Sequence, residues 1–234
     1  MRVITWNCNG AFRKKYHALE DFNADVLVIQ ECENPAESTK QFREWAGQFL
    51  WTGENKNRGI GVFARSNIEL SKLNWNDDGL QCFLPCRVNN AFDLVAVWTK
   101  QANSPNFRYI GQLWKYLKLH GEKLAGKPSL LVGDLNSNTC RDEWDRWWNH
   151  SDVVQVLSDL GLHSLYHSYF GEAQGQESRP TLFHTRNADK PYHVDYAFAS
   201  ADLFDPTEDA VEIGAVATWL GLSDHMPIIF PIQV

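Results

Sequence analysis

The stretch Leu130-Leu131-Val132-Gly133-Asp134-Leu135-Asn136-Ser137 places a carboxylate and a carboxamide directly after an apolar run. The run is typical of a buried strand, and the glycine marks its end. If the chain stays extended, residues two apart point the same way, so Asp134 and Asn136 project together from the end of this strand. Gly-Asp and Asn-Ser are also common turn sequences, so an ordinary polar turn is the alternative at this point.

The same arrangement of a polar residue at a strand end recurs along the chain. The further examples are Asn7 after Ile4-Thr5-Trp6, Glu31 after Val28-Ile29-Gln30, Asp195 within His193-Val194-Asp195-Tyr196, and Ser223-Asp224-His225-Met226-Pro227 before the last strand. Ligand crevices in α/β sheets lie outside the carboxyl ends of strands. Carboxylates with a carboxamide form an oxygen-rich set that suits Mg²⁺ or Mn²⁺ better than zinc, and an aspartate beside a histidine can orient and charge the imidazole.

The composition is ordinary for a globular protein with a large core: of 234 residues, 44% are hydrophobic and 22% are charged. Strands dominate both halves, and no repeat or linker divides the sequence, so residues 1–234 are predicted to form one α/β domain. The net charge of −7 argues against tight, non-specific duplex binding. It leaves room for a nucleic-acid enzyme with a local basic lip, for which Arg13, Lys56, Arg58 and Lys100 are candidates.

The five cysteines do not suggest a disulfide framework or a zinc site, because no Cys-x-x-Cys pair occurs. The sequence begins with a short strand rather than a charged segment and a long apolar core, and no stretch approaches the length of a membrane span. We therefore expect a reduced, cytoplasmic, soluble protein that does not associate with membranes and is a monomer.

Local patterns predict several individual elements. Phe12, Tyr16, Leu19 and Phe22 have helical spacing, a helix follows Pro105, and a helix capped by Ser151 or Asp152 runs to about Leu160. Two segments with weaker patterns are interpreted as a loop over 161–176 and a strand over 209–217. Trp144, Trp147 and Trp148 follow the Asp134 stretch closely and could stack the bases of a splayed strand, but a helix that buries two of them is the favoured interpretation.

Five motifs occur in an order that resembles the endonuclease/exonuclease/phosphatase superfamily, which includes exonuclease III, the apurinic endonucleases, DNase I and the inositol-polyphosphate phosphatases. They are Thr5-Trp6-Asn7-Cys8-Asn9-Gly10, Ile29-Gln30-Glu31, Gly133-Asp134-Leu135-Asn136, Val194-Asp195-Tyr196 and Ser223-Asp224-His225-Met226-Pro227. The resemblance spans nearly the whole chain. It implies an α/β (α+β) fold, a four-layer sandwich of two packed mixed β-sheets flanked by helices.

The resemblance also implies a role for each matched residue. Glu31 would bind a divalent metal, Mg²⁺ or Mn²⁺, directly, with Asn7 beside it and Asp224 contributing directly or through water. Asp134 would orient and deprotonate the attacking water. Asn136 would donate to the phosphoryl oxygens, and His225, held by Asp195, would add positive charge there.

One position departs from the family pattern. Where related enzymes carry a tyrosine or histidine motif, this chain has Val97-Trp98-Thr99-Lys100. We hypothesise that Lys100 supplies the cation or donor that the tyrosine or histidine supplies elsewhere. A solvated lysine at a strand end is the alternative.

The function predicted first is that of a divalent-metal-dependent phosphodiesterase acting on DNA, an endonuclease or exonuclease of exonuclease III-like type. A phosphatase or small-molecule phosphodiesterase is the second prediction, favoured by the acidic net charge and by the missing tyrosine motif. The third is a non-catalytic binding module that retains the pocket.

Overall fold

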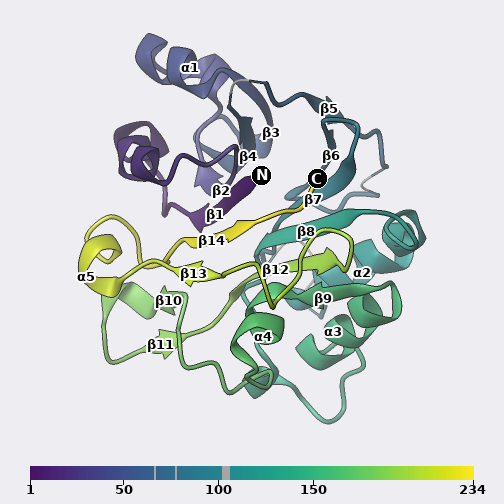
Figure 1. The fold of residues 1–234 in the computed structure, drawn as a ribbon. Coiled ribbons are helices and arrows are strands. Elements are labelled where there is room, and N and C mark those ends of the chain that lie inside the picture. Colours follow the sequence, from purple (N-terminus) through teal and green to yellow (C-terminus); the bar gives the residue numbers. More distant parts are fainter. Residues whose placement is uncertain (66, 77, 102–105) are drawn as a thin grey trace.

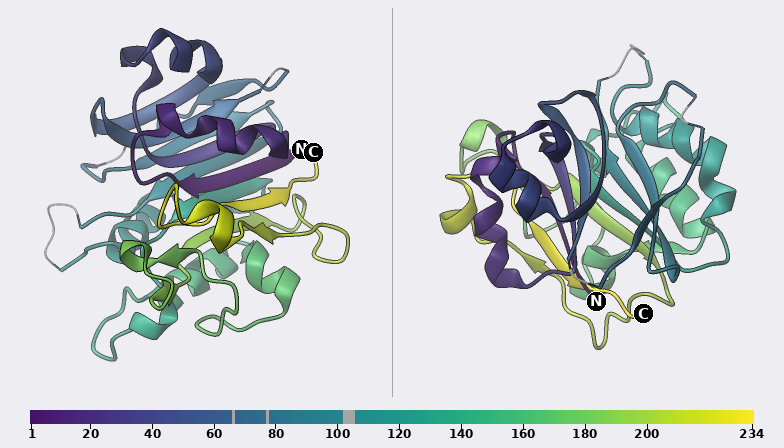
Figure 2. Two further views of the ribbon diagram at one scale, coloured as in Figure 1. Left: turned by 90° about the vertical axis from the view of Figure 1, so that its left-hand side faces the viewer. Right: turned by 90° about the horizontal axis from the view of Figure 1, so that it is seen from above.

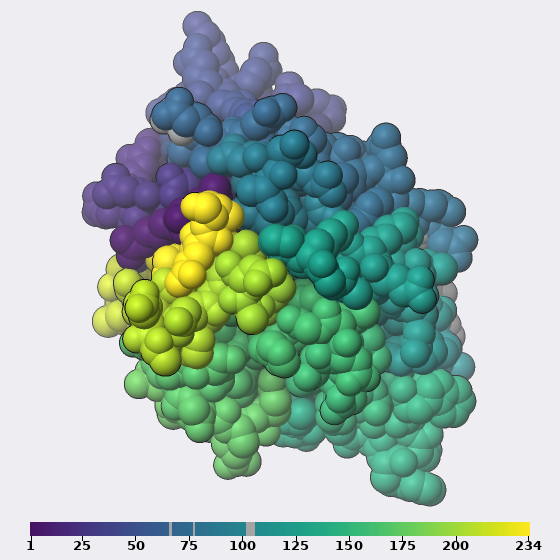
Figure 3. All heavy atoms as spheres, turned by 45° about the vertical axis from the view of Figure 1, so that its right-hand side comes forward, coloured from purple at the N-terminus to yellow at the C-terminus, as the bar shows by residue number. Residues whose placement is uncertain are grey.

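The structure, a computed structural model, describes residues 1–65, 67–76, 78–101 and 106–234. Two six-stranded mixed sheets pack face to face, and helices cover their outer faces, so that the chain forms four layers (Figure 1, Figure 2). The space-filling view shows the two halves of the chain closely packed against each other (Figure 3). This is the architecture that the sequence predicts.

The first sheet contains the N-terminal strands and the last strand of the chain, in the order β13-β14-β1-β2-β4-β3. Its strands are β1 (Arg2–Asn7), β2 (Val26–Cys32), β3 (Gln48–Asn55), β4 (Arg58–Ala64), β13 (Glu212–Ile213) and β14 (Ile228–Pro231). β1 pairs parallel with β2 and antiparallel with β14. The last strand therefore lies inside the sheet, directly beside the first.

The second sheet has the order β5-β6-β7-β8-β12-β9, with one parallel pair, β7 and β8. Its strands are β5 (Leu70–Lys72), β6 (Phe83–Val88), β7 (Phe92–Trp98), β8 (Ser129–Asp134), β9 (Leu162–Ser164) and β12 (Asp195–Ser200). A separate two-stranded ribbon joins β10 (Leu182–Phe183) to β11 (Pro191–Tyr192). β8 and β12 run antiparallel, and Asp134 and Asp195 are direct cross-strand partners.

Helices flank both sheets. The α-helices are α1 (Lys40–Ala46), α2 (Ile110–His120), α3 (His150–Asp159), α4 (Leu165–Phe170) and α5 (Val216–Trp219). The 3₁₀ helices are η1 (Phe12–Lys14), η2 (Tyr16–Phe22), η3 (Pro35–Glu37), η4 (Gly121–Lys123), η5 (Thr139–Arg141) and η6 (His184–Arg186). Across the described ranges, no helix combines the length and apolar character needed to cross a membrane.

Alternation along the strands divides the apolar residues among three buried clusters. Val28 and Val132 lie in the cluster between the two sheets. Ile29, one residue along β2, faces η2 and α1 on the outside of the first sheet, and Leu131 faces α2 and α3 on the outside of the second. A strand that is covered on both faces is apolar at successive positions, so its sequence is a continuous apolar run. Such runs allow these strands to be predicted from the sequence.

Several local predictions differ from the structure. Residues 12–22 form two 3₁₀ helices rather than one α-helix, because Tyr16, Leu19 and Phe22 recur every three residues, the period of a 3₁₀ helix. Residues 161–176 are not only a loop: they contain β9 and α4, in which Leu165 and Tyr166 are buried. The expected strand over 209–217 is limited to β13, and α5 follows it.

The segment around the three tryptophans is also different from the prediction. Asn149 caps α3 in a capping box with Asp152, so the helix begins after the tryptophans and not among them. Trp144 and Trp147 lie in an exposed loop, and the interpretation that a helix buries two of the three is wrong. The helix expected after Pro105 is α2, while Pro105 itself lies outside the described residues.

Candidate active site

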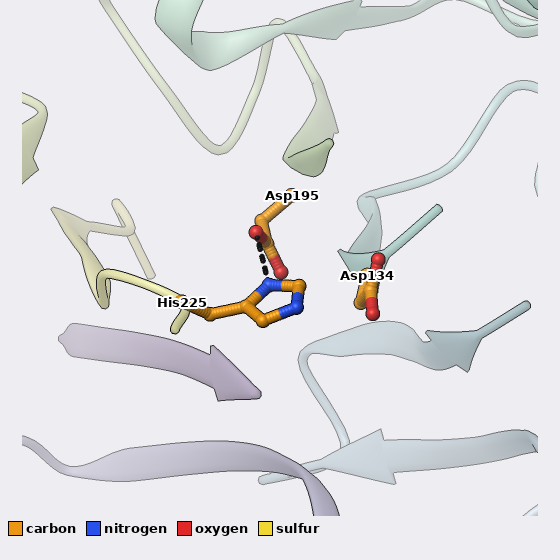
Figure 4. Close-up of side chains that lie close together, drawn as sticks. All are labelled: Asp134, Asp195 and His225. Atoms are coloured by element: carbon orange, nitrogen blue, oxygen red, sulfur yellow. Dashed lines mark hydrogen bonds and ion pairs between the residues drawn. The ribbon is translucent and has the colours of Figure 1, made fainter. Parts of the chain in front are cut away.

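The polar residues at the strand ends come together where the two sheets meet. Asn7 ends β1, Asp134 ends β8, and Asp195 begins β12 opposite Asp134. The Asn7 Nδ2 donates to Asp134 Oδ2 at 2.9 Å and to Glu31 Oε1 at 3.3 Å, so it joins one sheet to the other. His225 lies just before β14 and completes the group (Figure 4).

Asp134 is held by a tight turn at the end of β8. Gly133 has φ 144°, and a Cβ there would lie 1.9 Å from the Val97 carbonyl oxygen, so only glycine fits. Asn136 adopts the left-handed conformation with φ 46°, and its backbone N and its Nδ2 donate to the two oxygens of Asp134 at 2.8 and 2.9 Å. The two side chains converge as expected, but through a turn rather than an extended strand.

The environment of Asp134 favours its protonated form. The carboxyl group is buried, and its burial together with the negative charge of Asp195 raises its pKa to about 7. The charge of His225 and the hydrogen bond from Asn7 act in the opposite direction. A carboxyl group that titrates near neutral pH can accept a proton from water efficiently.

Asp195 and His225 form a buried ion pair. The His225 Nδ1 lies 2.8 Å from Asp195 Oδ2, while Nε2 points toward Asp134 (Figure 4). Burial lowers the pKa of His225, but the charges of Asp195 and Asp134 outweigh it and raise the pKa to about 10. The imidazole is therefore a cation at neutral pH.

Backbone and hydroxyl contacts fix this pair in position. Thr181 Oγ1 accepts hydrogen bonds from the backbone N of Val194 and Asp195, both at 3.0 Å. Ser223 Oγ donates to the Asn7 carbonyl at 2.8 Å and accepts from the His225 backbone N. Thr181 did not emerge from the sequence as a site residue, because it is 14 residues from its partner and carries no motif.

The predicted metal ligands Glu31, Asn7 and Asp224 are connected through hydrogen bonds. Asn7 donates to Glu31, and its Oδ1 accepts from the backbone N of Asn9 at 3.0 Å. Asn9 Nδ2 in turn donates to Asp224 Oδ1 at 2.7 Å. Sequence reasoning missed Asn9, although it is part of the first motif.

Glu31 is turned out of its strand by a bulge. Its φ is 63°, and the register of β2 against β4 shifts between Gln30 and Cys32. Bulges commonly redirect a side chain next to an active site. The Glu31 carboxylate thereby reaches the edge of the sheet, where Arg58 Nη2 donates to its Oε2 at 2.6 Å.

Two sets of side chains could bind a metal, and their chemistry differs. Among the described residues, Asp134, Asp195 and His225 offer ligand atoms within 4.8 Å of one another. In that set the imidazole is protonated and bonded to Asp195, and a protonated imidazole does not bind a metal. Glu31, which Asn7 contacts, and Asp224, which is linked to Asn7 through Asn9, supply the oxygen ligands that Mg²⁺ or Mn²⁺ prefers.

Lys100 and Arg58 lie against Trp98, the residue at which the sequence departs from the family pattern. The Arg58 guanidinium is 5.2 Å and the Lys100 Nζ 5.1 Å from the ring centroid. Lys100 forms an ion pair with Glu54 at 2.9 Å, whereas Arg58 bonds the predicted metal ligand Glu31. The structure thus brings Arg58 into the site, and the role hypothesised for Lys100 stays a prediction.

The Thr99 backbone next to this tryptophan supports Asn136. The Asn136 Nδ2 donates to the Thr99 carbonyl at 3.1 Å, and Thr99 Oγ1 donates to the Leu135 carbonyl at 2.6 Å. The backbone just after β7 therefore supports the turn that carries Asp134 and Asn136.

A family model for the endonuclease/exonuclease/phosphatase family matches residues 4–225. The chain belongs to this family. Members of the family are divalent-metal-dependent hydrolases of phosphoric esters, both nucleases and phosphatases. The order of the five motifs and the four-layer fold agree with this membership.

Three solved structures share the fold, and each comparison covers 100% of this chain and 100% of the other chain. A 3'-5' exonuclease (NExo) from Neisseria meningitidis has a TM-score of 0.73 at 20% sequence identity. A variant of the Neisseria 3' phosphatase NExo bound to a product DNA hairpin has a TM-score of 0.73 at 19% identity, and an AP endonuclease from Archaeoglobus fulgidus has 0.70 at 16%. No curated protein sequence matches the chain.

Proposed function

We propose that this family member is a divalent-metal-dependent phosphodiesterase that cleaves DNA. The observation that carries the proposal is the contact of Asp134 with both halves of the site. Its carboxyl group accepts a hydrogen bond from Asn7 in the first sheet and lies next to His225, which the last segment of the chain contributes. The base Asp134, the cation His225 and the oxygen-rich group of predicted metal ligands would thereby act on the same phosphate group.

The proposed mechanism assigns each group one task. Glu31, Asp224 and Asn7 would hold the metal, which supplies charge neutralisation at the phosphoryl group. Asp134 takes a proton from the attacking water, which its raised pKa permits. The water oxygen bonds to phosphorus as the bond from phosphorus to one ester oxygen of the DNA breaks, and that oxygen leaves and takes a proton from solvent water. The protonated Nε2 of His225 donates to the phosphoryl oxygens as negative charge accumulates on them. Asn136 Nδ2 would donate there too, after it exchanges its hydrogen bond to Asp134 Oδ2 for one to the phosphate.

A DNA substrate is supported by the charged surface next to the site and by the neighbouring folds. Arg108 and Arg141 line a pocket that also contains Asn136. Two of the similar structures are named as an exonuclease and an AP endonuclease. A 3' phosphatase activity is the second candidate, because a structure named as a 3' phosphatase with product DNA has the same fold.

The experiment is turnover of labelled single-stranded, duplex, abasic-site and 3'-phosphorylated DNA with Mg²⁺, with Mn²⁺ and with chelator. We expect metal-dependent strand cleavage that Glu31→Gln and Asp134→Asn abolish, while Glu44→Gln, on the exposed side of α1, leaves it unchanged. Release of inorganic phosphate without strand cleavage would favour the phosphatase. Absence of any turnover, with DNA binding retained, would favour the non-catalytic module.

Three further predictions belong to the same proposal. The protein would be a monomer, which light scattering after size exclusion tests. Residues 1–234 would form one domain, and the protein would be located in the cytoplasm. A single cooperative unfolding transition and fractionation of expressing cells would test these two statements.

A further inference from the structure

The loop between η5 and α3 carries two tryptophans whose side chains are exposed to solvent. Trp144 is 97% exposed and Trp147 is 65% exposed. The loop extends from the lower end of the molecule in the orientation of Figures 1 and 3. Neither side chain contributes to a hydrophobic cluster of the described residues, so folding does not explain their presence.

Trp147 continues into a row of aromatic rings that reaches α2, and Trp144 lies three residues before Trp147 on the same loop. The Trp147 ring lies 5.0 Å from Trp148 and perpendicular to it, Trp148 lies 4.4 Å from Phe107, and Phe107 is stacked 6.0 Å from Trp114. Gly111 allows this packing, since a Cβ there would be 3.0 Å from the Trp148 ring. We call Trp114, Phe107, Trp148, Trp147 and Trp144 the tryptophan track.

Lysines lie over the rings at the α2 end of the track. Lys115 Nζ is 4.2 Å from the Phe107 centroid, and Lys118 Nζ is 5.4 Å from the Trp114 centroid. Within the described residues, no acidic side chain forms an ion pair with either lysine. The track therefore combines the exposed side chains of Trp144 and Trp147 with two lysines at its α2 end. Aromatic side chains together with cations are the surface pattern of proteins that bind single-stranded nucleic acid.

Trp148, in the middle of the track, lines a pocket of about 530 Å³ beside the turn that carries Asn136. Asn136, Arg108 and Arg141 line it as well. Arg108 and Arg141 have no ion-pair partner among the described residues, and Arg141 lies 4.7 Å over the Tyr192 ring.

The acidic groups of the same loop reduce this positive charge only in part. Glu143 is paired with Arg146 at 3.3 Å, and Asp142 accepts hydrogen bonds from the first backbone N–H groups of α3. Asp145 lines the pocket together with the two arginines. Two unpaired arginines thus face one unpaired aspartate, and the pocket keeps a net positive charge.

We propose that the tryptophan track binds an unpaired strand of the DNA substrate and leads it to Asn136. The proposal rests on the proposed DNA cleavage and names the form of DNA that the site takes. Bases in a duplex are stacked on one another and cannot offer their faces to Trp144 and Trp147, whereas the bases of an unpaired strand can. Arg108 and Arg141 neutralise the phosphates that follow into the pocket.

The test is the affinity of fluorescein-labelled dT12 for the full chain in chelator, followed by fluorescence anisotropy at several salt concentrations. Trp144→Ala combined with Trp147→Ala should weaken binding by about 10-fold or more, the typical effect of losing one stacked base. Arg108→Ala should weaken binding and make its salt dependence shallower by about 0.7 in the log–log slope. Tyr169→Ala and Arg43→Ala, exposed residues away from the track, are the matched controls.

Measurements without metal separate this proposal from the proposed function. Loss of dT12 binding in the tryptophan variants, with hydrolysis of bis(p-nitrophenyl) phosphate by the Mn²⁺-loaded protein unchanged, would support the track. Wild-type affinity in the double variant, or a loss no larger than that of Tyr169→Ala, would overturn it even if DNA is cleaved. Tighter binding of duplex or of rU12 than of dT12 would overturn the assignment to unpaired DNA.

Discussion

Replacement of Asp195 by asparagine removes the charge that keeps His225 protonated and leaves the shape of the side chain nearly unchanged. Asp195 is 2% and His225 6% exposed, so solvent does not screen their 2.8 Å contact. Burial alone lowers the pKa of the imidazole. In Asp195→Asn we therefore expect the pKa of His225 to fall in the metal-free protein, because burial is then opposed by the remaining charges of Asp134 and Asp224 alone and no longer by Asp195.

The expected loss of stability can be worked out from the distance between the charges of His225 and Asp195. Opposite charges 2.8 Å apart attract by about 6 kcal/mol at an effective dielectric constant of 20. An imidazole that titrates at about 10 instead of 6.5 gains roughly 5 kcal/mol from its protonation. Because a neutral imidazole tolerates burial, we expect Asp195→Asn to lower the free energy of unfolding by about 3 kcal/mol at pH 7.5.

The raised pKa of His225 also determines whether the stability of the protein rises or falls with pH. A histidine with a raised pKa contributes its full stability below pH 6.5, its value in the unfolded chain, and loses it as the pH approaches 10. The wild-type protein should therefore lose stability between pH 7.5 and 10.5, whereas Asp195→Asn should lose markedly less over this range.

Two measurements in chelator test the reasoning. Nitrogen-15 NMR follows the protonation of the His225 ring with pH, with His225→Gln for assignment, and urea unfolding gives the stability at each pH. Asp93→Asn is the control, because Asp93 is a buried carboxylate at the opposite end of β7 that pairs with Arg87 and Lys127. It should destabilise the protein without moving the His225 titration, and an unchanged His225 pKa in Asp195→Asn would refute the argument.

Three other predictions concern the surroundings of the site. Gly133→Ala should cost about 3 kcal/mol or more in urea unfolding, because a Cβ would collide with the Val97 carbonyl, while Gly221→Ala, with open space around it, should be nearly neutral. Asn149→Ala should lower stability by about 1 kcal/mol through loss of the α3 cap, and an unchanged melting temperature would contradict this. Arg58→Ala should strengthen Mn²⁺ binding several-fold in calorimetry, since the guanidinium occupies Glu31 Oε2; equal or weaker binding would contradict it.

The family resemblance implied the four-layer fold, and the sequence pattern identified the polar residues at the ends of its strands. Runs such as Leu130–Val132 are apolar on both faces, and their length and termination identify buried strands without tertiary information. Asn7, Asp134 and Asp195 could be found because each lies directly at such a strand end. Their convergence follows from the packing of two sheets, which the family resemblance implied.

The contributions of Arg58 and Asn9 could not be predicted with the same rules. Arg58 reaches Glu31 only because β4 pairs with β2 and a bulge turns Glu31 outward, a contact between residues 27 positions apart. Asn9 bonds Asp224 across 215 positions. Sequence periodicity records local geometry, and these hydrogen bonds depend on the arrangement of distant strands.

The errors on individual elements have a similar origin. The three-residue spacing in η2 fits a 3₁₀ helix as well as one face of an α-helix, and propensity does not separate them. The tryptophan segment looked helical because aromatic residues are usually buried, and hydrophobicity alone cannot show that Trp144 has no protein surface to pack against. In both cases tertiary packing decides the outcome.

The position of β14 inside the first sheet affects how the chain matures on the ribosome. Until this strand has emerged, β1 has an unpaired edge that can pair with other chains, a common route to aggregation. His225 and Asp224 are made only a few residues before β14, so a nascent or prematurely terminated chain has neither a closed sheet nor a complete site. Closure of the first sheet and assembly of the candidate site therefore depend on the same segment, which is made late in synthesis.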